Sequence, residues 1–213
     1  RVTRITGKVD ITHRSDKMPV QNVITAPPST QIRVESEPAY NAFYSLTLLT
    51  RARELSGLAD WVYQTWDALS GDEQQDTDVV MNGLNYTVKP PRSFSSFEAY
   101  IHYLKSEDPE TLRDRMLDEY DKMDCCEMDP EETPLSRQEA LANADTYLAY
   151  LKQRFSDKVI SPEVERRAYT YAADPPRLKF FVVEYMQNMW ERYLSSEWQR
   201  TKSMLEDAVI AFN

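Results

Sequence analysis

Apolar side chains recur every three or four residues over most of the chain beyond residue 36, as in the series Tyr40, Phe43, Tyr44, Thr47 and Leu48. This spacing places side chains on one face of an α-helix, so the pattern predicts amphipathic helices that share a core. The expected helices cover approximately residues 36–56, 58–69, 72–82, 95–104, 108–123, 136–155, 161–173 and 174–213.

Local start and stop signals agree with these ranges. A capping Ser or Asp followed directly by proline favours a helix start, because proline lacks the N–H that would be unpaired in the first turn. Such pairs occur at Asp108-Pro109, Ser161-Pro162 and Asp174-Pro175. Gly57 and Gly71 are expected to end the helices before them. Residues 83–94, with one glycine and two prolines, and the polar residues 124–134 are predicted to be loops.

The last expected helix is the longest. Residues 177–213 contain no Pro or Gly, and an apolar stripe runs to the end of the chain through Phe180, Val183, Met186, Trp190, Leu194, Trp198, Thr201, Leu205 and Val209. At 1.5 Å per residue, a helix of this length reaches ~55 Å, which is more than a small domain needs. We therefore expect it to cross the whole domain, join a dimer or lead into another domain.

The N-terminal segment has a different pattern. Val2, Ile5, Val9 and Ile11 alternate with polar residues, which predicts a short strand or hairpin, and Pro27-Pro28 indicates a linker. Residues 31–35 form a further strand candidate. The expected organisation is an N-terminal extension and linker at 1–30 and a helical regulatory domain at 31–213. The fold class is all-α, a multi-helix domain with a short N-terminal β segment and a long C-terminal helix.

Charge is unevenly distributed along the chain. The formal net charge is −10, but residues 1–34 carry +4 and the remainder −14. Residues 107–132 alone contain twelve Asp or Glu against three Lys or Arg. A body this acidic repels phosphates, so we do not expect the helical domain itself to read DNA. The acidic segment is interpreted as a solvated face, with docking of a basic partner as the alternative.

Cellular location follows from what the sequence lacks. No run of about 18 apolar residues marks a membrane span, and the basic start lacks the apolar centre of a signal peptide. The two cysteines, Cys125 and Cys126, are adjacent and make a poor structural disulfide, which favours a reducing compartment. The expected location is the cytoplasm, without a membrane partner.

Motifs for catalysis and cofactors are missing as well. The four glycines are too scattered for a phosphate-binding loop, and the only histidines are His13 and His102. Glu98 lies one helical turn before His102, but a metal site needs further ligands. We therefore predict no catalytic residues, no metal and no cofactor. A helical-bundle metal enzyme is the remaining enzymatic alternative.

Aromatic residues are plentiful along the helical stripes. Most are expected to pack in the core, but tyrosine and tryptophan between helices also form pockets for apolar or aromatic small molecules. The candidate pocket residues are Tyr44, Trp61, Trp66, Tyr147, Trp190 and Tyr193.

One stretch of the last helix resembles a known family. The residues from Met189 to Arg200 read MWERYLSSEWQR, and Leu205-Glu206 follow. This order is similar to the end of the helical N-terminal region of ArsR-like bacterial transcription regulators. The start, a strand at 32–35 and a helix opened by Pro38-Ala39-Tyr40, is similar too. The resemblance implies a DNA-binding winged helix outside the present chain and no catalytic residues within it.

These observations predict a non-enzymatic regulatory domain of an ArsR-like regulator. It is expected to form a homodimer, to sense an apolar or aromatic effector, or both, and to bind DNA only through a module outside this chain. The alternative from another class is an acidic helical domain for protein–protein interaction.

Overall fold

The computed structural model describes residues 37–123, 133–155 and 160–212. The chain divides into two units, Arg1–Arg33 and Val34–Asn213, and all described residues belong to the second. This part is all-α, with no strand among the described residues. The predicted β segment, the acidic loop with its two cysteines and His13 lie outside those residues. No helix within them is long and apolar enough to cross a membrane.

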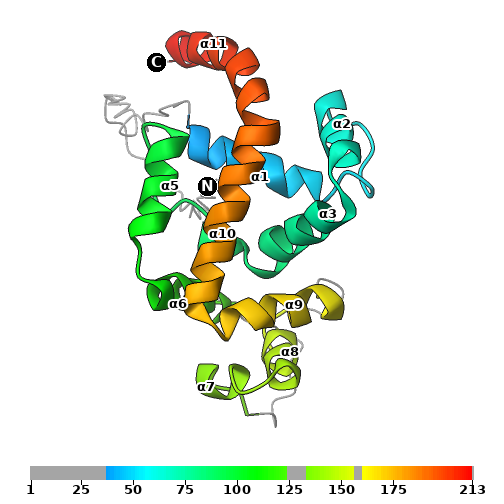
Figure 1. The fold of residues 1–213 in the computed structure, drawn as a ribbon, viewed down its shortest axis with the longest axis vertical. Helices are drawn as coiled ribbons and strands as arrows, with labels where there is room; N and C mark the ends of the chain where they lie inside the picture. Colours follow the sequence, from blue (N-terminus) through cyan, green and yellow to red (C-terminus); the bar gives the residue numbers. More distant parts are fainter. Residues whose placement is uncertain (1–36, 124–132, 156–159, 213) are drawn as a thin grey trace, which may run out of the picture. The chain divides into compact units, whose positions relative to one another are not determined.

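Eleven helices and two π-helical turns, η1 and η2, make up the described part of the chain (Figure 1). In order they are α1 (Pro38–Leu49), α2 (Asp60–Ala68), α3 (Gly71–Asp78), η1 (Val79–Gly83), α4 (Asn85–Val88), α5 (Phe97–Ser106), α6 (Pro109–Tyr120), α7 (Arg137–Ala140), α8 (Ala144–Lys152), α9 (Pro162–Ala172), α10 (Pro175–Met189), η2 (Trp190–Leu194) and α11 (Ser195–Phe212).

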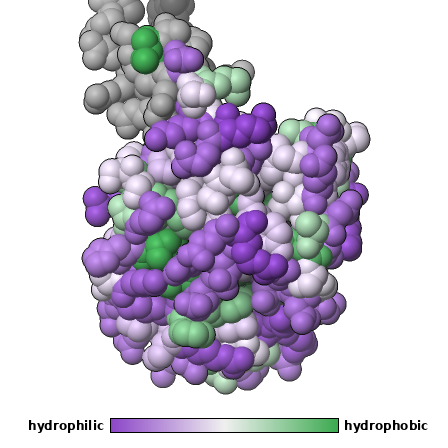
Figure 2. Space-filling model, turned by 45° about the horizontal axis from the view of Figure 1, so that its top comes forward, coloured by the Kyte–Doolittle hydropathy of each residue, from purple (hydrophilic) through white to green (hydrophobic). Residues whose placement is uncertain are grey.

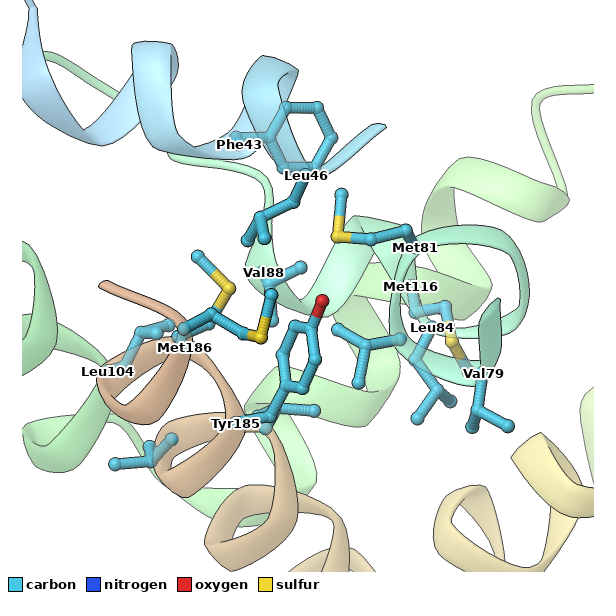
Figure 3. Close-up of a cluster of buried hydrophobic side chains, with 14 of the residues drawn as sticks. Phe43, Leu46, Val79, Met81, Leu84, Val88, Leu104, Met116, Tyr185 and Met186 are labelled. Carbon is cyan, nitrogen blue, oxygen red and sulfur yellow. The ribbon is translucent and has the colours of Figure 1, made fainter. Parts of the chain in front are cut away.

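Helix α10 lies at the centre of the packing. It contacts α4, α5, α6 and α9, and Figure 1 shows it running between α5 on one side and α3 on the other. Figure 3 shows the resulting core, to which α1, η1, α4, α5, α6 and α10 all contribute side chains. The Tyr185 hydroxyl remains satisfied inside this core because it lies 3.2 Å from Oγ1 of Thr77 on α3. The expected long C-terminal helix is confirmed, since helical turns run without a gap from Pro175 to Phe212.

Several predicted starts are confirmed by their caps, whereas the Ser161 side chain makes no capping hydrogen bond although α9 begins at Pro162. The side chains of Ser96, Asp108 and Asp174 accept hydrogen bonds from the backbone N–H groups three residues later. The first helix differs, because the buried side chain of Glu37 is its cap and accepts from the Tyr40 N–H at 3.1 Å. It also ends early, at Leu49, and is followed by turns rather than by further helix up to Gly57.

The loop predicted at 83–94 is partly wrong. It contains the short helix α4, in which Thr87 and Val88 are buried. The Thr87 hydroxyl donates to the Leu84 carbonyl at 2.6 Å, which satisfies that oxygen inside the protein. Burial against α6 and α10 explains this helix, which has no start signal in its sequence.

The single helix predicted at 136–155 is wrong as well. The chain turns at Leu141 and Ala142, so α7 and α8 are separate helices. Oδ1 of Asn143 accepts hydrogen bonds of 3.0 Å from the backbone N–H groups of Asp145 and Thr146, and the Thr146 side chain caps in return. A capping box inside an apolar periodic stretch therefore starts a new helix.

This cap gives a first testable prediction. Asn143→Ala removes the acceptor of two N–H groups and is expected to lower the free energy of unfolding by about 1 kcal/mol. Asn143→Ser keeps a capping oxygen and is expected to cost only a fraction of that. Urea unfolding followed by circular dichroism measures both. Equal losses for the two variants would show that capping is not the reason for the break.

Candidate functional site

The most distinctive local feature of the C-terminal helix is the π turn η2, Trp190–Leu194. A π turn holds an extra residue, and such turns occur often at functional sites. Here the extra residue lets Trp190 and Leu194 both stay buried while α10 continues into α11. It also directs the turn's side chains toward two different neighbours, α5 and α3.

Toward α5, the turn makes an aromatic cluster. The ring of Trp190 stacks on that of Phe97, with centroids 4.2 Å apart and planes at 10°. Trp198 follows two helical turns later, and the centroid of its ring lies 6.4 Å from that of Trp190. Phe97 is the first residue of α5 because Ser96 caps this helix. The Ser96 hydroxyl accepts a hydrogen bond from the Ala99 N–H at 3.1 Å.

Toward α3, the turn makes a polar cluster. Arg192 forms an ion pair with Glu73, and the Tyr193 hydroxyl lies 3.2 Å from the same carboxylate. Burial by itself would raise the pKa of Glu73, but hydrogen bonds from Ser70, the Arg192 charge and the Tyr193 hydroxyl outweigh it and lower that pKa. Glu73 also completes the capping box of α3, so this cluster ties the π turn to the start of another helix.

Three hollows have Trp190 in their walls, and two of them also include a second residue of η2. We call the first of these two, of about 450 Å³, the α5 hollow. It is lined by Phe97, Glu98, Ile101, His102, Lys105, Gln187, Trp190, Glu191 and Ser195. The second, of about 230 Å³, is the α11 groove between α1, α2 and α11. It is lined by Asn41, Ala42, Ser45, Trp61, Trp190, Leu194, Glu197, Trp198, Thr201, Met204 and Leu205.

The walls of these hollows combine apolar surfaces with a few polar groups. Their floors are aromatic and aliphatic, and the rims carry charged and amide groups such as Lys105, whose Nζ lies 2.9 Å from Oε1 of Gln187. Glu98 and His102 both line the α5 hollow, but no group of three or more His, Cys, Asp or Glu within the described residues is placed to hold a metal. An apolar or aromatic molecule with one polar edge fits this arrangement.

Two of the six candidate pocket residues, Trp61 and Trp190, meet at the α11 groove. The other four lie apart from it. Tyr193 faces Glu73, Trp66 is buried under the Arg53 guanidinium, and Tyr44 is 57% exposed and stacks on Tyr40. Tyr147 is fully buried on α8, with its ring 5.7 Å from that of Tyr169.

Sequence reasoning did not select Phe97 or Trp198 for the site. Phe97 immediately follows the Ser96 cap, and Trp198 stands two helical turns after Trp190 on the same stripe. The spacing of Trp198 was therefore visible in the sequence, whereas the stacking of Phe97 on Trp190 joins residues 93 positions apart. No local pattern encodes such a contact.

The surface around these elements is mainly hydrophilic. Figure 2 shows small, separate hydrophobic areas among hydrophilic side chains. The described residues include a few large apolar side chains that are well exposed, among them Phe180, Met204 and Ile210. Isolated exposed apolar residues are normal, so the hollows beside Trp190 are better candidates for a site than any open patch.

Comparison with other proteins provides no further assignment. No family model, curated protein or solved structure matches this chain.

Proposed function

We propose that the described residues belong to a non-enzymatic regulatory domain that senses an apolar or aromatic small molecule beside Trp190. The observation that carries this proposal is the position of Trp190. Its side chain lines both the α5 hollow and the α11 groove, and it belongs to the π turn that connects the core helix α10 to α11. A molecule bound in the α11 groove contacts Trp198 as well as the turn on which the direction of α11 depends.

The coupling has a physical basis in the two halves of the helix. Helix α10 buries six side chains and is held in the core, whereas α11 lines the α11 groove with Glu197, Trp198, Thr201, Met204 and Leu205. A π turn differs from an α turn by a single residue, so conversion of one into the other alters the register of the residues after it. The effector's contacts with Trp190 and Trp198 would favour one register.

The resemblance to ArsR-like regulators supports the same proposal. In that class, a helical region precedes a winged helix, and the matching residues here are those of η2 and early α11. Homodimer formation, and DNA binding through a module outside residues 1–213, are parts of this proposal that the resemblance alone supports.

The sensing proposal predicts a defined effect of a small aromatic probe. Indole at ten times its dissociation constant is expected to raise the free energy of unfolding by about 1.4 kcal/mol and to slow amide hydrogen exchange in residues 195–205. Trp198→Ala, which removes one wall of the α11 groove, is expected to abolish the slowing. Thermal unfolding and hydrogen exchange with mass spectrometry measure the two effects.

A matched control is Ser203→Ala, because Ser203 is exposed on the same helix. This variant is expected to respond to indole like the original chain. Stabilisation by indole without any slowing of exchange in α11, or an unchanged response in Trp198→Ala, would contradict the coupling.

A further inference from the structure

A buried carboxylate lies in a different part of the domain. Glu165, on α9, is only 8% exposed, and its Oε2 has no hydrogen-bond partner among the described residues. Removing a carboxylate from water costs several kcal/mol unless it is paired. Burial raises the pKa of Glu165 to about 7. A buried polar atom without a partner among the described residues calls for an explanation.

Glu165 lines a cavity of about 270 Å³, which we call the Glu165 cavity. Its walls come from six helical elements and the segment that precedes α9. They consist of Thr47, Arg51, Met81, Asn82, Asn85, Tyr86, Tyr120, Leu151, Phe155, Ile160 and Glu165. This cavity shares no residue with the α5 hollow or the α11 groove.

The polar atoms in this cavity are deficient in donors. Besides Glu165, the buried Oδ1 of Asn85 has no partner within the described part of the chain. The Tyr120 hydroxyl already donates to the Gly83 carbonyl at 2.9 Å. Thr47 likewise donates to the Phe43 carbonyl, at 3.0 Å. Glu165 and Asn85 therefore each carry a buried oxygen without a donor within the described residues, and a ligand rich in N–H donors suits this pair. The buried Tyr147 hydroxyl, which interacts with the Glu165 charge, has no partner there either.

The other walls suit the organic part of such a ligand. The rings of Tyr86 and Tyr120 meet edge to face with centroids 5.8 Å apart, and Tyr120 makes the same kind of contact with Phe155 at 5.4 Å. Aromatic faces attract cations through their π electrons, which adds to the attraction of a carboxylate. At about 270 Å³ the cavity is at the small end of the range for ligand sites, so the ligand is small.

The close packing of η1 on α9 fixes the position of the carboxylate. A Cβ added at Gly83 would lie 2.7 Å from Cβ of Ala168 and 3.5 Å from Oε2 of Glu165. Only glycine lets the π turn approach this near, and the approach shields Oε2 from water. The unpaired oxygen is thus held in place by the fold.

We propose that the Glu165 cavity binds a small primary amine, with its ammonium group next to the Glu165 carboxylate and its apolar part against Tyr86, Tyr120 and Phe155. The ammonium supplies both the missing charge and the missing donors. This site is additional to the one beside Trp190.

The surrounding charges allow this binding. Arg51 is the cation that lines the cavity, but its side chain is 49% exposed and pairs with Glu54 at 2.9 Å, so it does not neutralise Glu165. Within the part of the chain that the structure describes, the other titratable side chains around the carboxylate are tyrosines. Burial raises the pKa of Tyr86, and burial together with the Glu165 charge raises those of Tyr120 and Tyr147. All three stay neutral near pH 7, which leaves Glu165 as the group that titrates there.

The experiment is calorimetric titration of the full chain at pH 8 with benzylamine and with its neutral analogue benzyl alcohol. We expect saturable one-to-one binding of benzylamine with a dissociation constant of about 1 mM or less, and at least tenfold weaker binding of the alcohol. Glu165→Gln is expected to weaken amine binding at least tenfold. Glu163→Gln is the matched control, because Glu163 is exposed on the same helix, and it should leave binding unchanged.

A second measurement does not depend on the stability of the variant. Benzylamine stays protonated between pH 6 and 8 while Glu165 ionises, so its affinity for the original chain is expected to rise about tenfold over this range. Equal binding of the amine and the alcohol, unchanged affinity in Glu165→Gln, or no saturable benzylamine binding would overturn the proposal. The last result would indicate that the two oxygens bind only water.

Discussion

The stability of the folded chain is expected to depend on Glu165 most strongly between pH 4.5 and 7. The pKa of this carboxyl is 4.5 in the unfolded chain and about 7 in the folded one, because burial disfavours its charged form. The folded state therefore holds the proton more tightly. The contribution of Glu165 to stability is fully present below pH 4.5 and is lost as pH rises to 7, a change of about 3 kcal/mol.

This dependence is isolated by comparing variants. Glu165→Gln cannot ionise, whereas all other groups titrate as before. The difference in unfolding free energy between Glu165→Gln and the original chain should therefore shift by about 3 kcal/mol in favour of the variant from pH 4.5 to pH 8. Urea unfolding at closely spaced pH values measures it. A difference that does not change with pH would mean that the Glu165 carboxyl is not buried in solution.

Replacement of Gly83 by alanine is expected to destabilise the chain by about 2 kcal/mol. The new Cβ would lie 2.7 Å from Cβ of Ala168, and neither atom can rotate away because both are fixed to the backbone. The turn η1 would have to move off α9, which loosens the packing around Glu165. Gly71→Ala is the matched control, because a Cβ at Gly71 meets nothing within 4 Å and alanine favours the helix there.

A double-mutant cycle tests the cause. Ala168→Gly removes the opposing methyl group, so the pair Gly83→Ala with Ala168→Gly is expected to recover at least 1 kcal/mol relative to the sum of the single changes. Chemical unfolding of the four proteins gives this coupling energy. Additive losses would show that the close contact is not what limits position 83.

The two proposed sites adjoin different π turns. The groove and hollow beside Trp190 adjoin η2, and the Glu165 cavity adjoins η1 through Met81 and Asn82. Each π turn thus lies next to unfilled space. A ligand beside Trp190 is proposed to act on α11. A ligand in the Glu165 cavity is proposed to neutralise the charge of the buried carboxylate.

The candidate site could be predicted only in part. Trp61 and Trp190 were chosen from their stripes, and they do line one groove, but four other aromatic residues with the same sequence signature lie elsewhere. Periodicity shows that a ring faces inward without showing which rings meet. Glu165 gave no signal at all, because a glutamate in an amphipathic helix looks the same whether its side chain reaches water or is covered by another helix.

The sequence by itself determined the all-α class, the long C-terminal helix and most helix starts. Caps such as Ser96, Asp108 and Asp174 act within three residues, so their hydrogen bonds need no other part of the chain. The tertiary structure alone decided the helix α4, the stacking of Trp190 on Phe97 and the burial of Glu165 under Gly83. Those features depend on the distance between helices far apart in the chain, and packing sets that distance.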